Sequence, residues 1–172
     1  MKRLMLILLL TMLTHLNVTG QNLKKDNALT FDRPKSEEPI PNPYIIGYPK
    51  DVIMEKVAGY FKDSEMQLDP TFTRKEEGIL VTKPFIFVKG TLTRSRLDRF
   101  GNCPAVEKRN WTRGRVTFQI VVEAVNPNQS KISISGRLEG LSQELSGSNW
   151  IGCQSNGQIE LQVLEQLIES LK

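Results

Sequence analysis

The residues best suited to bind a charged ligand lie in one basic stretch, residues 89–115. This stretch holds eight Lys and Arg residues against Asp98 and Glu107, a local charge of about +6, and Phe100 and Trp111 lie among them. Cations interleaved with aromatic rings can hold phosphates, anionic lipid headgroups or acidic sugars. The candidate anion-binding residues are Arg94, Arg96, Arg99, Lys108, Arg109 and Arg113.

The spacing within this stretch leaves two interpretations open. The alternation from Thr91 to Arg96 would place Arg94 and Arg96 on the same side if the chain were extended there. That arrangement would favour a binding face. The alternative is a solvated strand face followed by a soluble loop, in which each charge contributes little.

Catalytic chemistry has little support in this sequence. The single histidine, His15, lies in the N-terminal apolar segment, so the rest of the chain has neither a His-activated nucleophile nor a His-ligated zinc site. Two pairs of acids are adjacent, at residues 37–38 and 76–77, whereas a glycosidase needs two carboxylates that face one bond across a cleft. We therefore expect no enzyme activity, no metal and no cofactor. A histidine-free carbohydrate-active enzyme is the less favoured alternative.

The N-terminus predicts export. Lys2 and Arg3 precede an almost unbroken apolar run over residues 4–13, and Val18 and Gly20 suit the −3 and −1 positions of a cleavage site. This order is that of a secretory signal peptide over residues 1–20. The apolar run is short for a membrane span, which needs about 20 apolar residues, although a retained anchor remains the alternative. We expect a periplasmic or extracellular protein whose mature chain has no transmembrane segment.

Removal of the signal peptide changes the overall charge. The mature chain loses two cations and no acid, so its formal charge falls from +4 to about +2. A nearly balanced charge does not favour nucleic acid as a partner.

The two cysteines, Cys103 and Cys153, predict a disulfide. A lone pair in an exported chain is most simply bonded, and no Cys-x-x-Cys motif favours a redox or metal site. Closing a loop of this length stabilises the fold by roughly 4 kcal/mol in the chain-entropy model.

The folded domain is expected to begin after a tether. Residues 21–48 contain four prolines and several charges, which favours a disordered, Pro-rich segment. Residues 49–172 are predicted to form a single α+β domain that carries the basic, Cys-containing insertion at about residues 85–113.

A hairpin is the strongest element signal in this domain. Apolar and polar residues alternate over residues 114–125 and again over 131–138, and residues 126–130 are rich in turn formers. Alternation of this kind is typical of strands with one buried face, and the intervening turn favours an antiparallel pair.

Two amphipathic helices and short strands complete the expected domain. Residues 50–62 and 158–171 carry apolar stripes with helical spacing, and Ser155 with Gln158 fits a capping box. Residues 79–82 predict a short strand, whereas the Gly- and Ser-rich residues 141–153 predict a loop. We expect one antiparallel sheet of about four strands, packed on one face by an N-terminal and a C-terminal helix in two layers.

This pattern resembles the helix-grip repeat of BamC (NlpB)-like envelope proteins. The resemblance rests on Gly-Ile-Leu-Val-Thr-Lys at residues 78–83, Arg-Val-Thr-Phe-Gln-Ile at 115–120 and Lys-Ile-Ser-Ile-Ser at 131–135, and it covers roughly residues 51–138. The chain departs from that family in lacking a lipid-accepting cysteine and in having one repeat. The resemblance implies a helix-grip fold and an accessory role in a bacterial envelope, without catalytic residues.

The expected function is therefore binding. We expect a non-enzymatic exported binding or accessory domain of the cell envelope, whose partner is an envelope protein or an anionic envelope component. The alternative is specific binding of an anionic lipid or an acidic polysaccharide through residues 89–115.

Overall fold

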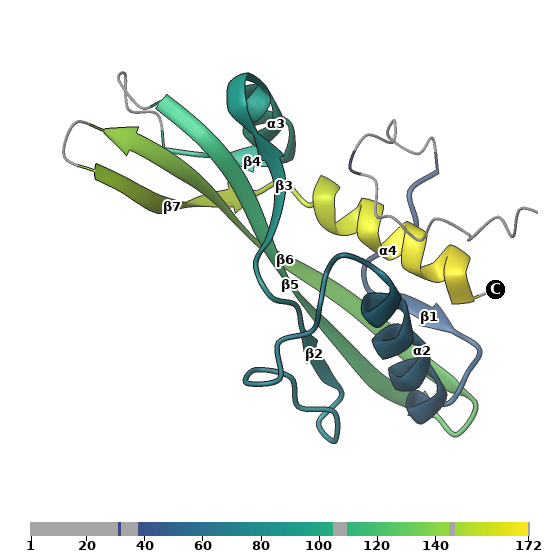
Figure 1. Ribbon diagram of the computed structural model, residues 1–172. Helices are drawn as coiled ribbons and strands as arrows, with labels where there is room; N and C mark the ends of the chain where they lie inside the picture. Colours follow the sequence, from purple (N-terminus) through teal and green to yellow (C-terminus); the bar gives the residue numbers. More distant parts are fainter. Residues whose placement is uncertain (1–30, 32–37, 105–109, 145–146, 172) are drawn as a thin grey trace, which may run out of the picture.

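The computed structural model describes residue 31 and residues 38–104, 110–144 and 147–171 (Figure 1). The signal peptide expected over residues 1–20 lies outside these residues. Within the described part of the chain, no helix combines the length and the apolar character that a membrane span requires.

A long two-stranded hairpin forms the centre of the fold (Figure 1). Strands β5 (Asn110–Asn126) and β6 (Gln129–Glu144) pair antiparallel along nearly their whole length. Val116, Phe118 and Ile120 of β5 point to one face and are fully buried. The predicted hairpin is confirmed, and it extends further at both ends than the alternating residues indicate.

Both edges of the hairpin carry further antiparallel strands. Strands β2 (Ile79–Val81) and β3 (Phe85–Lys89) pair with β5, whereas β1 (Tyr44–Ile46) and β7 (Gly147–Ser155) pair with β6. Strand β4 (Gly101–Asn102) extends the sheet beyond β7. The α+β class and the single antiparallel sheet are confirmed, but the sheet has seven strands within the described residues and not about four.

Strand β7 accounts for part of this difference. The loop predicted at residues 141–153 is wrong, because β6 continues through its first residues and β7 takes up most of the rest. Glycine and serine have low strand propensity, but main-chain pairing with a long neighbouring strand outweighs such a local preference.

Strand β1 corrects the end of the predicted tether, residues 21–48. Its backbone pairs with the start of β6, and the Asn42 side chain extends the pairing. The Asn42 amide donates to the Ile134 carbonyl over 2.7 Å, and its Oδ1 accepts from the Ile134 N–H over 3.1 Å. Prolines exclude a helix here but permit an edge strand. The expected tether also includes residues 21–30 and 32–37, which lie outside the described residues.

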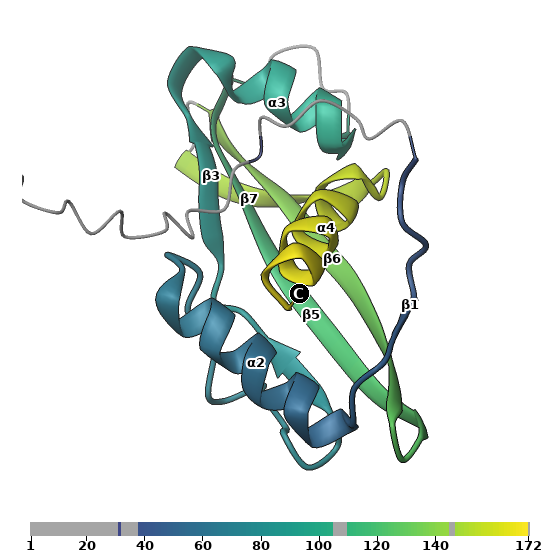
Figure 2. The ribbon, with the colours of Figure 1, turned by 90° about the vertical axis from the view of Figure 1, so that its right-hand side faces the viewer.

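The helices lie on one face of the sheet. Figure 2 shows α2 (Lys50–Asp63), α3 (Thr93–Phe100) and α4 (Gln158–Leu171) in front of the β5–β6 hairpin. Helices α2 and α4 are the two that the sequence predicts, and α3 is additional. No described helix covers the opposite face.

The start of α4 differs from the predicted capping box. The Ser155 hydroxyl donates to Glu160 Oε2 over 2.8 Å, and Gly136 N–H donates to Glu160 Oε1 over 3.2 Å. Asn156 Oδ1 accepts from the Gln158 N–H over 3.1 Å and provides a side-chain acceptor at the helix start. The Ser155 side chain is thus engaged by a buried glutamate and not by the Gln158 side chain.

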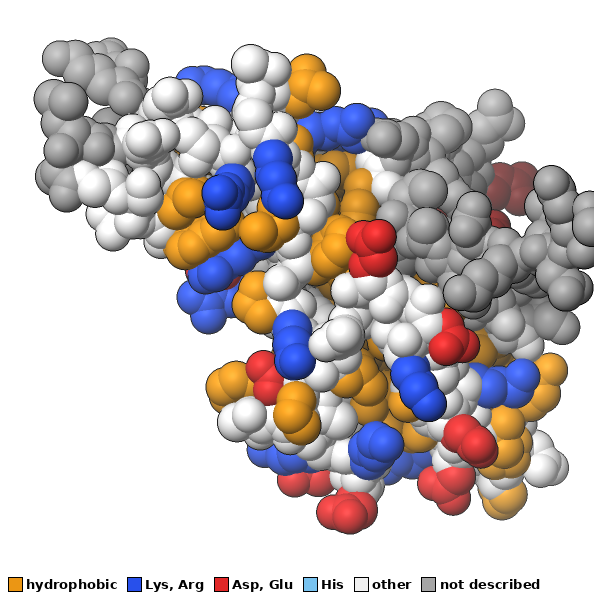
Figure 3. Space-filling view, in the orientation of Figure 1, with side chains coloured by type: hydrophobic (Ala, Val, Ile, Leu, Met, Phe, Trp, Pro, Cys, Tyr) orange, Lys and Arg blue, Asp and Glu red, His pale blue; other side chains and the backbone are white. Residues whose placement is uncertain are grey.

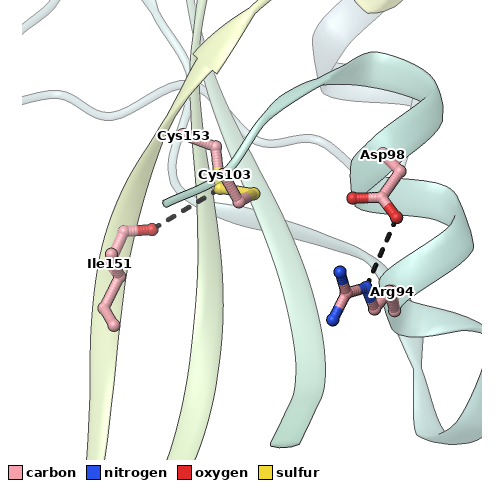
Figure 4. Close-up of a disulfide and its surroundings, with 5 residues drawn as sticks. All are labelled: Arg94, Asp98, Cys103, Ile151 and Cys153. Carbon is pink, nitrogen blue, oxygen red and sulfur yellow. Dashed lines mark hydrogen bonds and ion pairs between the residues drawn. A yellow bond between two sulfur atoms is a disulfide. The ribbon is translucent and has the colours of Figure 1, made fainter. Parts of the chain in front are cut away.

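The predicted insertion at about residues 85–113 is more regular than expected. It contains β3, a 3₁₀ turn η1 (Gly90–Leu92), α3 and β4. Leu97 and Phe100 of α3 are buried, which seats this helix on the same core as α2 and α4. The predicted disulfide between Cys103 and Cys153 is confirmed, and it ties the chain after β4 to β7 (Figure 4).

Candidate anion-binding site

The face of the sheet opposite the helices, here called the outer face, collects charged residues at one end of the hairpin. On β5, Arg115 and Thr117 flank buried Val116 and therefore point to the outer face. Their partners on β6 are Glu139, opposite Arg115, and Arg137, opposite Thr117. Directly opposed residues share a face, so Arg115, Glu139 and Arg137 lie together there.

Arg115 is held by two different contacts. Its Nε donates to Glu139 Oε2 over 2.8 Å, and its guanidinium carbon lies 4.0 Å from the centroid of the Trp150 ring. An arginine stacked on an aromatic ring gains cation–π attraction, and the ion pair fixes the direction of the guanidinium. Arg115 is therefore pre-oriented before any ligand arrives.

Glu139 is the acceptor that organises this group. It is 5% exposed and also accepts from Arg137 Nη2 over 3.1 Å through Oε1. A buried carboxylate is costly unless it is paired, and here two arginines pair with it. One acid against two cations leaves a local charge of +1.

Both arginines keep donors for a ligand. Neither Nη of Arg115 donates to a described residue, and the same holds for Nε and Nη1 of Arg137. The Arg137 side chain is 76% exposed. A guanidinium that is fixed at one edge and unoccupied at another suits bidentate binding of a carboxylate or phosphate.

A second cation pair lies on the next row of the sheet. Lys89 of β3 stands directly opposite Arg113 of β5, both are exposed, and neither forms an ion pair with a described residue. Like charges directly opposite each other destabilise a strand pair. A bound anion would remove this repulsion.

These four residues, Lys89, Arg113, Arg115 and Arg137, are called the cationic face below. Figure 3 shows Lys and Arg side chains next to hydrophobic ones over the region of β3, β5 and β7. The register identifies apolar neighbours: Ile86 stands opposite Arg115, and Leu141 stands between Arg113 and Trp150. With Glu139 included, the net charge of this group is +3.

The other end of the outer face is electrically balanced. Lys131 of β6 stands opposite Glu123 of β5, and Lys131 Nζ lies 2.8 Å from Glu123 Oε2. Among the described residues, the cations of the outer face that lack an acidic partner therefore lie at the end near β3 and β7.

Of the six anion-binding residues predicted from the sequence, those that the structure describes do not all lie together. Arg113 lies on the outer face, whereas Arg94, Arg96 and Arg99 lie on α3. The extended conformation considered for residues 91–96 is wrong, because Leu97 and Phe100 recur at helical spacing and anchor a helix in the core. Lys108 and Arg109 lie outside the described residues.

The three arginines of α3 have separate surroundings. Arg94 Nε lies 3.5 Å from Asp98 Oδ2, and the dashed line between their side chains in Figure 4 marks this ion pair. Arg96 Nη1 donates to the Phe31 carbonyl over 3.3 Å, and the Arg99 guanidinium lies 5.3 Å from the Phe100 ring centroid. Arg94 and Arg96 are two positions apart and point to different sides of the helix, whereas Arg96 and Arg99, three positions apart, are neighbours on one side. The three arginines therefore do not share one face.

Sequence reasoning missed Arg137, Glu139 and Trp150 as site residues. Trp150 stacks with Arg115. No local pattern indicates this contact, because it depends on the register of β5 with β6 and of β6 with β7. The sequence does indicate the direction of Arg115, because the alternation of apolar and polar residues along β5 places its side chain on the face away from the core.

Comparison with known proteins gives no relative. No protein-family model, no curated protein and no solved structure matches the chain. The resemblance to BamC-like proteins and the helix-grip assignment therefore stay predictions. Within the described residues, no group of three or more His, Cys, Asp or Glu residues could hold a metal ion.

Proposed function

We propose that the protein is an exported, non-catalytic binding domain that holds an acidic polysaccharide of the cell envelope on its cationic face. The observation that carries the proposal is the fixed guanidinium of Arg115, beside Lys89 and Arg113, which form no ion pair with a described residue. Pre-orientation lowers the entropy cost of binding. Binding of an anion is also favoured because it would reduce the repulsion between Lys89 and Arg113.

The spacing of the cations suits a polymer. Neighbouring strands lie about 4.8 Å apart, and alternate residues on one strand lie about 6.7 Å apart. Lys89 and Arg113 are neighbours across strands, whereas Arg113 and Arg115 are neighbours along one. Several anionic groups in a row can therefore contact the face at once, and each contact releases counterions.

The apolar side chains of this region favour a soluble polyanion over a bilayer. Ile86, Leu141 and Trp150 are half-buried and do not protrude. Among the described residues, the hydrophobic side chains with the largest exposed fractions are Phe72 and Leu92, and both lie outside the cationic face. Peripheral membrane binding needs apolar side chains that enter the lipid, together with cations.

Two further observations support export and binding without catalysis. The disulfide favours an oxidising compartment, in agreement with the predicted signal peptide. Glu139 is engaged by two arginines, and its cross-strand neighbours are Arg115 and Gly152. A glycosidase would need a second carboxylate facing the same bond. An accessory role in the envelope, periplasmic or extracellular, is part of this proposal.

The test compares three ligands and two variants of equal charge. Ligands are polygalacturonate, neutral dextran and phosphatidylglycerol vesicles, each at low and high salt. The variant Lys89→Ser with Arg113→Ser removes two cations from the face, and Lys62→Ser with Lys75→Ser removes two exposed cations elsewhere.

We expect wild type to bind polygalacturonate at low salt, and to bind dextran and vesicles weakly or not at all. The face variant should lose roughly tenfold or more in affinity, since phosphate- or carboxylate-type contacts act together, whereas the matched control should not. Absent binding at low salt, equal losses in both variants, or binding to vesicles alone would overturn the proposal.

A further inference from the structure

A small hollow lies at the end of the hairpin that also carries the cationic face. Its volume is about 310 Å³, and it is lined by Gly90, Thr91, Arg94, Asn110, Trp111 and Thr112. Gly90 and Thr112 are the sequence neighbours of Lys89 and Arg113, so the hollow lies at the same end of the hairpin as the second cation pair. It sits where η1 and α3 meet the start of β5.

Trp111 forms the apolar part of the lining. The residue is 9% exposed, and its Cε3–Cζ3 edge packs so closely on Gly140 that a Cβ added there would lie 2.5 Å from both atoms. The opposite edge of the indole, which carries the N–H, therefore faces away from Gly140. No described residue accepts a hydrogen bond from this N–H, so it can donate to a ligand.

The other residues that line the hollow are polar, and only some of their donors and acceptors take part in contacts with described residues. Arg94 Nε lies 3.5 Å from Asp98 Oδ2, but both side chains are mostly exposed, and such surface pairs are weak. The other Arg94 nitrogens can thus bind a carboxylate. Asn110 and Thr91 are exposed, and Thr112 Oγ1 donates to the Leu141 carbonyl over 3.4 Å and keeps acceptor capacity.

We propose that this hollow binds one sugar ring that carries a carboxylate, a uronic acid. The ring's C–H groups would contact the indole, its hydroxyls would meet Asn110 and the threonines, and its carboxylate would meet Arg94. The volume is at the lower end of small-molecule sites, about 300–1,000 Å³, which suits one or two rings. The choice of ligand rests on the proposed function, but the site itself is separate from the cationic face.

The experiment is a titration followed by NMR of the two indole N–H signals, because the chain contains two tryptophans. The variant Trp150→Phe assigns them. Galacturonate, glucose and a short oligogalacturonide are the ligands. We expect a saturable shift of the Trp111 signal with the acidic ligands and at least a tenfold weaker response to glucose. A response to galacturonate would show that the hollow binds a free monosaccharide. A response to the oligogalacturonide alone would show that it binds the terminal ring of a chain.

The variant Arg94→Gln tests the carboxylate contact, and Arg74→Gln, another exposed arginine of an ion pair, is its matched control. Arg94→Gln should remove the preference for acidic over neutral sugar, while the control keeps it and both variants keep their other amide signals. No saturable shift of Trp111, an equal response to glucose, or an unchanged preference in Arg94→Gln would overturn the subsite.

The two proposals fail differently. Polygalacturonate binding without any Trp111 response overturns the subsite and leaves the cationic face. A saturable Trp111 response to galacturonate without polymer binding overturns the cationic face and supports the subsite. The Lys89→Ser, Arg113→Ser variant should lose the polymer and keep the Trp111 response within about twofold, since Arg94 and Trp111 are intact.

Discussion

The guanidinium of Arg115 stacks on the indole of Trp150, with its central carbon 4.0 Å from the ring centroid. The two residues come from strands β5 and β7, which are not neighbours in the sheet, because β6 runs between them. Glu139 of β6 completes the contact by accepting from Arg115 Nε. Three strands thus fix one cation on the outer face.

Replacing Trp150 should loosen Arg115. Trp150→Ala should lower the free energy of unfolding by about 1–2 kcal/mol, since a partly desolvated cation–π contact and half-buried area are lost. It should also weaken polygalacturonate binding several-fold, because Arg115 is no longer pre-oriented. Urea denaturation and a binding titration measure the two effects. Trp150→Phe keeps a ring and should retain most of both; equal effects of the two variants would contradict this role.

Glu139 should matter more for stability than Arg137, although the two share a hydrogen bond. Glu139→Ala leaves the largely buried Arg115 side chain without its counter-charge and should cost about 2–3 kcal/mol. Arg137→Ser removes an exposed partner and should cost less than about 0.5 kcal/mol. Denaturation curves of the two variants give the comparison. Costs of similar size would show that Glu139 does not anchor the cluster.

Gly140 should not tolerate a side chain. A Cβ there would lie 2.5 Å from two ring atoms of Trp111 and 2.8 Å from Leu97 Cδ1, so Gly140→Ala should destabilise by about 1–3 kcal/mol through overpacking. Gly152 of β7 is the matched control, because an added Cβ there meets nothing within 4 Å. Gly152→Ala should stay within about 0.5 kcal/mol of wild type. Thermal or urea unfolding distinguishes the two, and equal costs would contradict the close approach of Trp111.

The disulfide should contribute strongly to stability. Cys103 and Cys153 are 50 residues apart, so replacing both by Ala should cost up to about 4 kcal/mol in the chain-entropy model. Thiol titration of the unreduced, unfolded protein should find no free cysteine. Two titratable thiols per chain, or a double variant as stable as wild type, would refute this prediction.

The parts of the fold that were predictable from the sequence are those with a strong local period. The alternation around Phe118 and the helical stripe with Ile53 and Val57 each identify an element, because burial of one face imposes the period. The bonded cysteines follow from their number and the predicted compartment. These signals require no knowledge of the neighbours in space.

The remainder depends on pairing between distant residues. Strand β7 has a Gly- and Ser-rich sequence and forms because the extended β6 offers it a partner. Helix α3 was missed because Thr93 and Arg94 fit an alternating pattern locally, while Leu97 and Phe100 provide the helical spacing. Arg115 and Trp150 are far apart in the sequence, and only the pairing of β5 with β6 and of β6 with β7 brings them into contact. The centre of the candidate site could therefore not be predicted from either stretch alone.

The most direct test of the cationic face is the salt dependence of polygalacturonate binding. Affinity is measured at several salt concentrations for wild type and for the Lys89→Ser, Arg113→Ser variant, and the slope of log K against log salt is compared. If each cation neutralises one carboxylate, the variant's slope should be shallower by about one to two units, with the Lys62→Ser, Lys75→Ser control unchanged. Equal slopes for wild type and the face variant, or no measurable binding by wild type at low salt, would contradict the account.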